Sequence, residues 1–339
     1  MRKNNLPIII LGWTMLGIFG MSGCGAKKPL NEKELLESIN EQDTELSFVT
    51  FDNLEITKRQ TNDEDKTDEV YCTISGKSQY ADYTADCILY SNFYDQGGWI
   101  LDNVEISDYK YDVISFLSEE EVGNYFDENF AYLITSPVTT YEYSGIKRNV
   151  ESDDKMYASY DVDFSAAFTS TLSYETSGKL TLSFSFDGSS DQWNYSDNYY
   201  ILDKQYIPEL EGDWSIWSAD EIINDSRGWG KYIYDGQNYE YVNVDSQGVE
   251  TSDRQTLQID VLQGTMYRYD NDGESVYCEF DWNNGSIRNY VVEGQPDVYT
   301  ESFKVYLDDY DFSQPSEASE ESSIFNKNGS LDGLSKYTH

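Results

Sequence analysis

Histidine is almost absent from this sequence: its 339 residues include one, His339. The Ser-His-Asp and Cys-His arrangements that activate a nucleophile therefore lack their base. The commonest zinc ligand is missing as well, and no Cys-x-x-Cys pair replaces it. Neither of the glycine-rich phosphate-binding patterns occurs. We expect a protein that is not an enzyme and that has no built-in metal site and no cofactor.

Positive charge is also scarce. Lysine and arginine together number 23 against 63 acidic residues, which gives a net charge of −40. Nucleic-acid binding needs a basic face, so the composition excludes it. A surface this acidic indicates high solubility, cationic partners or loosely held cations. Paired carboxylates can hydrolyse glycosides, but among so many acidic residues the sequence identifies no particular pair.

The composition does not indicate a disordered chain. Tyrosine, phenylalanine and tryptophan number 30, 15 and 7, and they alternate with polar residues as in β-sheets. A chain of this length predicts two or three domains. Only residues 313–339, which are acidic and rich in serine, have the composition of a disordered tail.

Residues 1–23 have the layout of an export signal. Arg2 and Lys3 precede an apolar run of about 15 residues, which is shorter than the roughly 20 that a membrane-spanning helix needs. The run leads into Met21-Ser22-Gly23-Cys24. This motif resembles the lipobox of bacterial lipoproteins, with Met21 in place of the usual leucine.

The resemblance implies that the chain is cut before Cys24 and that this cysteine carries a diacylglyceryl group. Two acyl chains are enough for a stable membrane anchor. We therefore expect a lipoprotein anchored on the extracytoplasmic face of the cell membrane, with residues 24–29 as a short tether. The alternatives are an uncleaved anchor and an ordinary secreted protein.

A helix-start pattern occurs twice, about 90 residues apart, as in an internal repeat. Asn31 with Glu34, and later Ser118 with Glu121, have the spacing of a capping box. Strand-like stretches follow the first helix near residues 46–56, 69–75, 82–94 and 99–106. We predict two repeated domains, residues 30–112 and 113–207, each with one helix on an antiparallel sheet. This architecture resembles the cystatin-like and NTF2-like folds.

Residues 208–312 are predicted to be almost entirely β-structure. Strands are expected near residues 230–234, 239–244, 255–262, 265–269, 275–282, 286–292 and 303–307. Asn283-Asn284-Gly285 predicts a hairpin turn between two of them. This region is expected to form a small β-barrel or sandwich. The predicted fold class is thus α+β followed by all-β.

Two of the remaining cysteines flank a predicted hairpin. Cys72 and Cys87 lie at equal distances from its midpoint at Gln79-Tyr80, so they are expected to lie directly opposite each other. A disulfide between them would persist outside the cytoplasm. The alternative is a pair of buried thiols. Cys278 has no evident partner and is expected in the core.

The tryptophans near the start of the β region offer a possible binding surface. Trp214, Trp217 and Trp229 fall close together in the sequence, and exposed tryptophan beside carboxylates can bind a sugar. The alternative is that they form the core. The acidic segment 270–274 likewise has two possible interpretations, a calcium-binding segment or a hairpin turn.

These observations lead to two functional hypotheses. The first is a membrane-anchored, non-catalytic protein-interaction module whose partners are other cell-surface proteins, since open sheets offer docking sites. The second is a lipoprotein that binds a small ligand such as a sugar, a peptide or Ca²⁺.

Overall fold

A computed structural model describes residues 28–149, 155–217, 228–245, 249–290 and 299–305. The chain divides into two compact units, residues 1–112 and 113–339. The predicted signal peptide, Cys24 and the predicted tail lie outside the described residues. None of the helices that the structure describes is long and apolar enough to cross a membrane.

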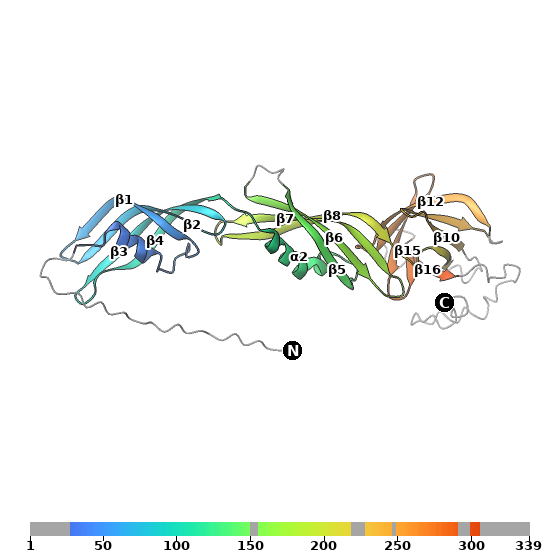
Figure 1. Cartoon of the computed structure of the whole chain (residues 1–339), viewed down its shortest axis with the longest axis horizontal. Coiled ribbons are helices and arrows are strands. Elements are labelled where there is room, and N and C mark those ends of the chain that lie inside the picture. The colour runs from blue at the N-terminus through green and yellow to red at the C-terminus, as the bar shows by residue number, and fades with distance from the viewer. Residues whose placement is uncertain (1–27, 150–154, 218–227, 246–248, 291–298, 306–339) are drawn as a thin grey trace. The chain divides into compact units, whose positions relative to one another are not determined.

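The first unit contains one helix and one antiparallel sheet (Figure 1). The sheet has four strands in sequential order, each paired with the next. The elements are α1 (Glu32–Ile39), β1 (Thr50–Asn62), β2 (Thr67–Lys77), β3 (Ala81–Tyr94) and β4 (Gly98–Val113). This is the predicted architecture of the first repeat, and all four predicted strands are present.

The predicted capping box at the start of α1 is confirmed. The side chain of Asn31 accepts a hydrogen bond from the backbone N–H of Glu34 (3.0 Å), and the Glu34 carboxylate accepts one from the N–H of Asn31 (2.8 Å). Two otherwise unpaired donors of the first turn are thereby satisfied. Leu35 and Ile39 are the buried residues of the helix.

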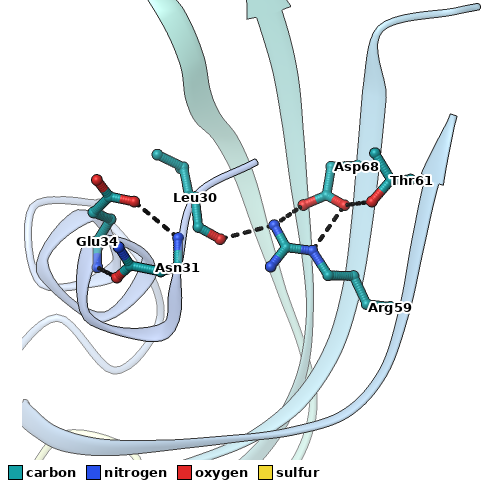
Figure 2. Close-up of polar contacts among 6 residues, drawn as sticks. All are labelled: Leu30, Asn31, Glu34, Arg59, Thr61 and Asp68. Carbon is teal, nitrogen blue, oxygen red and sulfur yellow. Dashed lines mark hydrogen bonds and ion pairs between the residues drawn. The ribbon is translucent and has the colours of Figure 1, made fainter. Parts of the chain in front are cut away.

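A buried ion pair ties the entry of α1 to the sheet (Figure 2). Arg59 on β1 donates from Nε and Nη2 to the two carboxylate oxygens of Asp68 on β2, at 3.0 and 2.6 Å. The same Nη2 donates to the carbonyl of Leu30 (2.8 Å), just before the helix, and Thr61 donates to Asp68 (2.7 Å). The Asp68 side chain is fully buried, so its charge is compensated only by these contacts.

The second unit begins with the same architecture. It comprises α2 (Glu119–Leu133), β5 (Thr140–Asn149), β6 (Tyr157–Phe168), β7 (Tyr174–Asp187) and β8 (Gln192–Tyr206), and the strands again pair in sequential order. Ser118 and Glu121 form the second predicted capping box. Phe126 and Phe130 of α2 are buried, and Phe130 packs on Phe164 of β6 with ring centroids 5.2 Å apart. The predicted repetition of helix and sheet is confirmed.

The rest of the second unit is a closed antiparallel barrel, one of the two folds that the sequence left open. Strands β10 to β16 each pair with the next, and β9 closes the barrel by pairing with both β10 and β16. The strands are β9 (Gly212–Trp217), β10 (Gly228–Tyr234), β11 (Tyr239–Val244), β12 (Glu250–Asp260), β13 (Thr265–Tyr269), β14 (Ser275–Asp281), β15 (Ser286–Tyr290) and β16 (Tyr299–Val305). The predicted turn at residues 283–285 joins β14 to β15, and Gly285 there has a φ of +71°.

The barrel and the second sheet share one packed interface. The carbonyl of Leu262 accepts hydrogen bonds from the backbone N–H groups of Thr135 (3.0 Å) and Ser136 (2.8 Å). Trp282 is 5% exposed, packs on the ring of Tyr174 at 5.0 Å, and donates its indole N–H to the Ser136 hydroxyl (3.2 Å). The predicted domains 113–207 and 208–312 thus lie in a single compact unit.

Removing the carboxylate of Asp68 should destabilise the first unit. Asp68→Ala leaves the partly buried guanidinium of Arg59 without its counter-ion, which typically costs about 3–5 kcal/mol. Hydrogen exchange of the β2 and β3 amide groups should show this loss of protection. The matched control is Asp95→Ala, which breaks an exposed ion pair with Lys66 (2.7 Å) and should change nothing measurable. Equal protection in the two variants would contradict the structural role assigned to Asp68.

Candidate functional site

The second sheet has one buried face and one polar face. On β6 and β7, inward residues such as Val162, Leu180 and Leu182 are 0–1% exposed. Their neighbours along each strand point to the opposite face. That outer face is lined largely by serine, threonine and charged side chains, so it is able to meet solvent or a partner.

A shallow trough crosses this outer face. One row of paired residues runs from Glu142 on β5 through Ser165 and Ser177 to Lys204 on β8. Small serines on the two central strands lie between long side chains on the two edge strands. The result is a depression of about 440 Å³ whose lining includes these four residues and Glu175. We call these five residues the serine trough.

The serine trough carries a net negative charge. Lys204 lies 3.7 Å from a carboxylate oxygen of Glu175, and both side chains are more than half exposed. Glu142 accepts a hydrogen bond from the Ser165 hydroxyl (3.4 Å) and forms no ion pair with any described residue. The trough therefore offers one uncompensated carboxylate beside two hydroxyl groups, which suits a cationic or hydrogen-bonding ligand.

Two exposed side chains continue the outer face along β8. Tyr199 is 57% exposed and Ile201 is 61% exposed. In the sheet register they lie opposite Thr181 and Lys179 of β7. This part of the face adds an aromatic ring and an aliphatic side chain to the polar trough.

The edge strands are less suited to docking than the outer face. The pairing of β5 is interrupted by a register shift between Tyr143 and Gly145. In the first sheet, the long edge strand β4 carries Asp102, Glu105 and Asp108. Bulges and charges of this kind hinder the addition of a further strand.

Trp214 lies in the barrel core. It is fully buried, and its indole N–H donates to the carbonyl of Leu210 (2.8 Å). Its ring meets that of Tyr232 edge-on, with centroids 5.7 Å apart. The structure therefore favours the core interpretation of Trp214 over an exposed sugar-binding surface. Trp217 and Trp229 lie in β9 and β10, but their side chains are outside the described part of the structure.

The acidic segment 270–274 forms a turn that caps itself. One carboxylate oxygen of Asp270 accepts hydrogen bonds from the N–H groups of Asp272 (3.0 Å) and Glu274 (2.9 Å). Gly273 has a φ of +83°, which glycine adopts without strain. This geometry favours the turn interpretation. Within the described ranges, no group of three or more His, Cys, Asp or Glu side chains is arranged to hold a metal ion.

Cys72 and Cys87 lie directly opposite each other in the β2–β3 pair, as the hairpin register predicts. Both are 3% exposed, and their sulfur atoms are 3.2 Å apart as free thiols. The thiol–thiol hydrogen bond, together with burial, raises the pKa of Cys72 far above its usual range. A disulfide between them stays a prediction. Cys278 is fully buried in the barrel, as expected of a core residue.

The structure adds two features to those predicted from the sequence, the serine trough and a buried arginine, Arg268. The alternation of serine with apolar residues along β6 and β7 indicates a polar face, but not a depression in it. Arg268 lies two residues after the buried Met266 in the same strand. Alternate residues of a strand point to the same face, so the sequence does indicate that Arg268 faces the core.

Comparison of the sequence with protein-family models, curated proteins and solved structures finds no match. The resemblance to cystatin-like and NTF2-like folds stays a prediction from the helix-and-sheet architecture.

We expect Cys72 and Cys87 to form a disulfide in the exported protein. The bridge would close a loop of about 15 residues and add about 3 kcal/mol to the stability of the first unit. Under denaturing, non-reducing conditions, an alkylating reagent should then label only Cys278 among the described cysteines. The control variant Cys278→Ser should show no labelled cysteine. Labelling of Cys72 and Cys87 in protein freshly taken from cells would contradict the bridge.

Proposed function

We propose that this protein is a membrane-anchored, non-catalytic extracytoplasmic lipoprotein that docks other cell-surface proteins on the serine trough. The observation that carries this proposal is the outer face of the second sheet. Its two central strands present small hydroxyl side chains between charged walls, and a register shift in its edge strand β5 hinders strand addition.

The chemistry of the trough favours a positively charged, extended polypeptide segment. Glu142 is available to pair with a lysine or arginine, and the hydroxyls of Ser165 and Ser177 are positioned to hydrogen-bond a peptide backbone. The net charge of −40 adds a long-range attraction for basic partners. A depression of about 440 Å³ is large enough for one or two side chains of such a segment.

The anchor at Cys24 supports a role at the cell surface. A lipid-anchored protein diffuses in two dimensions, where even a modest docking affinity is enhanced by the high effective concentration of other membrane-bound proteins. The serine trough would bind its partner under these conditions, at the membrane surface. Small-ligand binding remains the second candidate function, and a buried charge in the barrel favours it, as described in the next subsection.

Cys24→Ser should release the protein from the membrane. Without the thiol, no diacylglyceryl group can be attached, and the acidic chain has no other affinity for an anionic bilayer. Labelled palmitate fed to cells should appear in the wild-type protein and not in the variant. Cys278→Ser is the matched control and should keep the label. Label on the Cys24→Ser protein would contradict lipidation at this position.

The docking proposal is tested by placing a photo-activated cross-linking residue at position 165 or 177 in intact cells. Both positions should yield the same protein adduct, because both lie on the floor of the trough. Thr73, on the helix-free face of the first sheet, is the matched control position and should not yield it. Glu142→Gln should weaken the adduct roughly tenfold, the effect of losing about 1.4 kcal/mol.

Two results would overturn the docking proposal. One is an adduct of equal strength from position 73, which indicates random collision. The other is no protein adduct from either trough position. Attachment to a glycan instead of a polypeptide would replace the docking function with sugar binding.

A further inference from the structure

The barrel interior contains a buried arginine that has no acidic partner among the described residues. Arg268 on β13 is 6% exposed. Three other described arginines, Arg59, Arg254 and Arg288, each have a carboxylate oxygen at 2.6, 2.9 and 2.7 Å respectively. No described carboxylate forms an ion pair with Arg268. A fifth described arginine, Arg148, stacks on the Phe116 ring instead. Arg268 is thus the most buried of the described arginines and has no described counter-ion.

Two buried tyrosines surround the guanidinium. Its central carbon lies 4.4 Å from the centroid of the Tyr241 ring. Tyr232 pairs with Tyr241 across β10 and β11, and their ring centroids are 5.0 Å apart. Both hydroxyls and the Nε of Arg268 are buried without an aligned hydrogen-bond partner among the described residues. Both hydroxyls lie close enough to the guanidinium to interact with it, although neither is aligned for a full hydrogen bond.

None of the neighbouring titratable groups supplies the missing negative charge. Burial raises the pKa of Tyr232 and of Tyr241, although the nearby guanidinium partly opposes this. Burial likewise raises the pKa of the Cys278 thiol, which lies 3.4 Å from the side-chain oxygen of Asn289. All three groups are therefore neutral near pH 7, and the described side chains around Arg268 carry a net charge of about +1.

An uncompensated buried guanidinium is costly. The free-energy cost of desolvating such a charge is larger than the stabilisation from a cation–π contact with one tyrosine. Ordered water would satisfy the N–H and O–H groups but would leave the charge unbalanced. The interior is therefore better suited to an anion than to water or to further apolar packing.

We propose that the barrel interior binds a small organic carboxylate through Arg268, with the hydroxyls of Tyr232 and Tyr241 as further donors. A monoanion matches the single positive charge, whereas a phosphate dianion would leave a buried negative charge. The planar guanidinium also matches the two oxygens of a carboxylate. Met266 and Trp214, both fully buried, indicate that the rest of the ligand is apolar.

The end of the barrel that faces the second sheet is closed. The turns that follow β12 and β14 pack on the second sheet through Leu262 and Trp282. Tyr239, at the start of β11, also closes this end, because its hydroxyl bonds the backbone N–H and carbonyl of Ile207. Arg268 lies one residue from the opposite end of β13.

The proposal is tested by thermal unfolding of the full chain in mild detergent at constant ionic strength. Acetate, benzoate and hexanoate are the probes, and hexanamide is the uncharged control. At about a hundred times its dissociation constant, a carboxylate that binds should raise Tm by roughly 5–10 °C. Hexanamide should give no shift. A response to chloride or phosphate with none to any carboxylate would overturn the ligand class.

Arg268→Met is the decisive variant, since it replaces the cation with an apolar side chain of similar length. Without ligand its Tm should equal or exceed that of the wild type, because a costly charge is gone, and the carboxylate response should be lost. Arg254→Met, which removes an exterior guanidinium paired with Glu240, should keep the response. A response that survives in Arg268→Met would overturn the proposal.

A second pair of variants covers the case in which Arg268→Met fails to fold. Tyr232→Phe and Tyr241→Phe each remove one hydroxyl that has no aligned partner, so the barrel should still fold. Each should weaken carboxylate binding several-fold. Unchanged binding in both, or a wild-type protein that no carboxylate stabilises, would show that Arg268 serves the barrel structure alone. These experiments do not involve the serine trough, so their failure is distinguishable from failure of the docking proposal.

Discussion

Each repeated unit depends on holding one helix against one face of its sheet. Helix α1 has eight residues, too few to be stable by itself in water. The structure compensates at the helix entry, where the carbonyl of Leu30 accepts a hydrogen bond from Arg59 (2.8 Å). In the second unit the carbonyl of Leu117 accepts one from Tyr160 (2.8 Å). Different side chains thus perform the same task, and in both units the opposite face of the sheet is left polar.

Local features of this fold could be predicted from the sequence, and features that depend on register could not. The capping residues of both helices and the Cys72–Cys87 pairing each follow from spacings within one element or one hairpin. The pairing of the first half of β1 with β2 depends on register shifts between Phe51 and Asn53 and between Ile56 and Lys58. No pattern in the sequence predicts those shifts. The serine trough likewise requires knowing which residues of β5 and β8 flank the central strands.

The packing of the second sheet against the barrel could not be predicted from the sequence, for a related reason. It rests on backbone hydrogen bonds from residues 135–136 to Leu262 and on the packing of Trp282. Backbone hydrogen bonds between distant segments do not depend on residue type, so no pattern in the sequence predicts them. The inward position of Arg268 is different, because its two-residue spacing from Met266 is visible in the sequence. What the sequence does not reveal is that no described carboxylate forms an ion pair with Arg268.

The two proposed sites place opposite demands on the charge of the molecule. The serine trough gains from the surrounding negative surface, which draws basic partners toward it. The barrel interior must receive an anion through that same field, so the field slows entry and favours ligands with a large apolar part. Added salt screens the surface charges over about 8–10 Å but hardly affects a buried ion pair. Higher ionic strength therefore weakens docking at the trough while easing the approach of a carboxylate to Arg268.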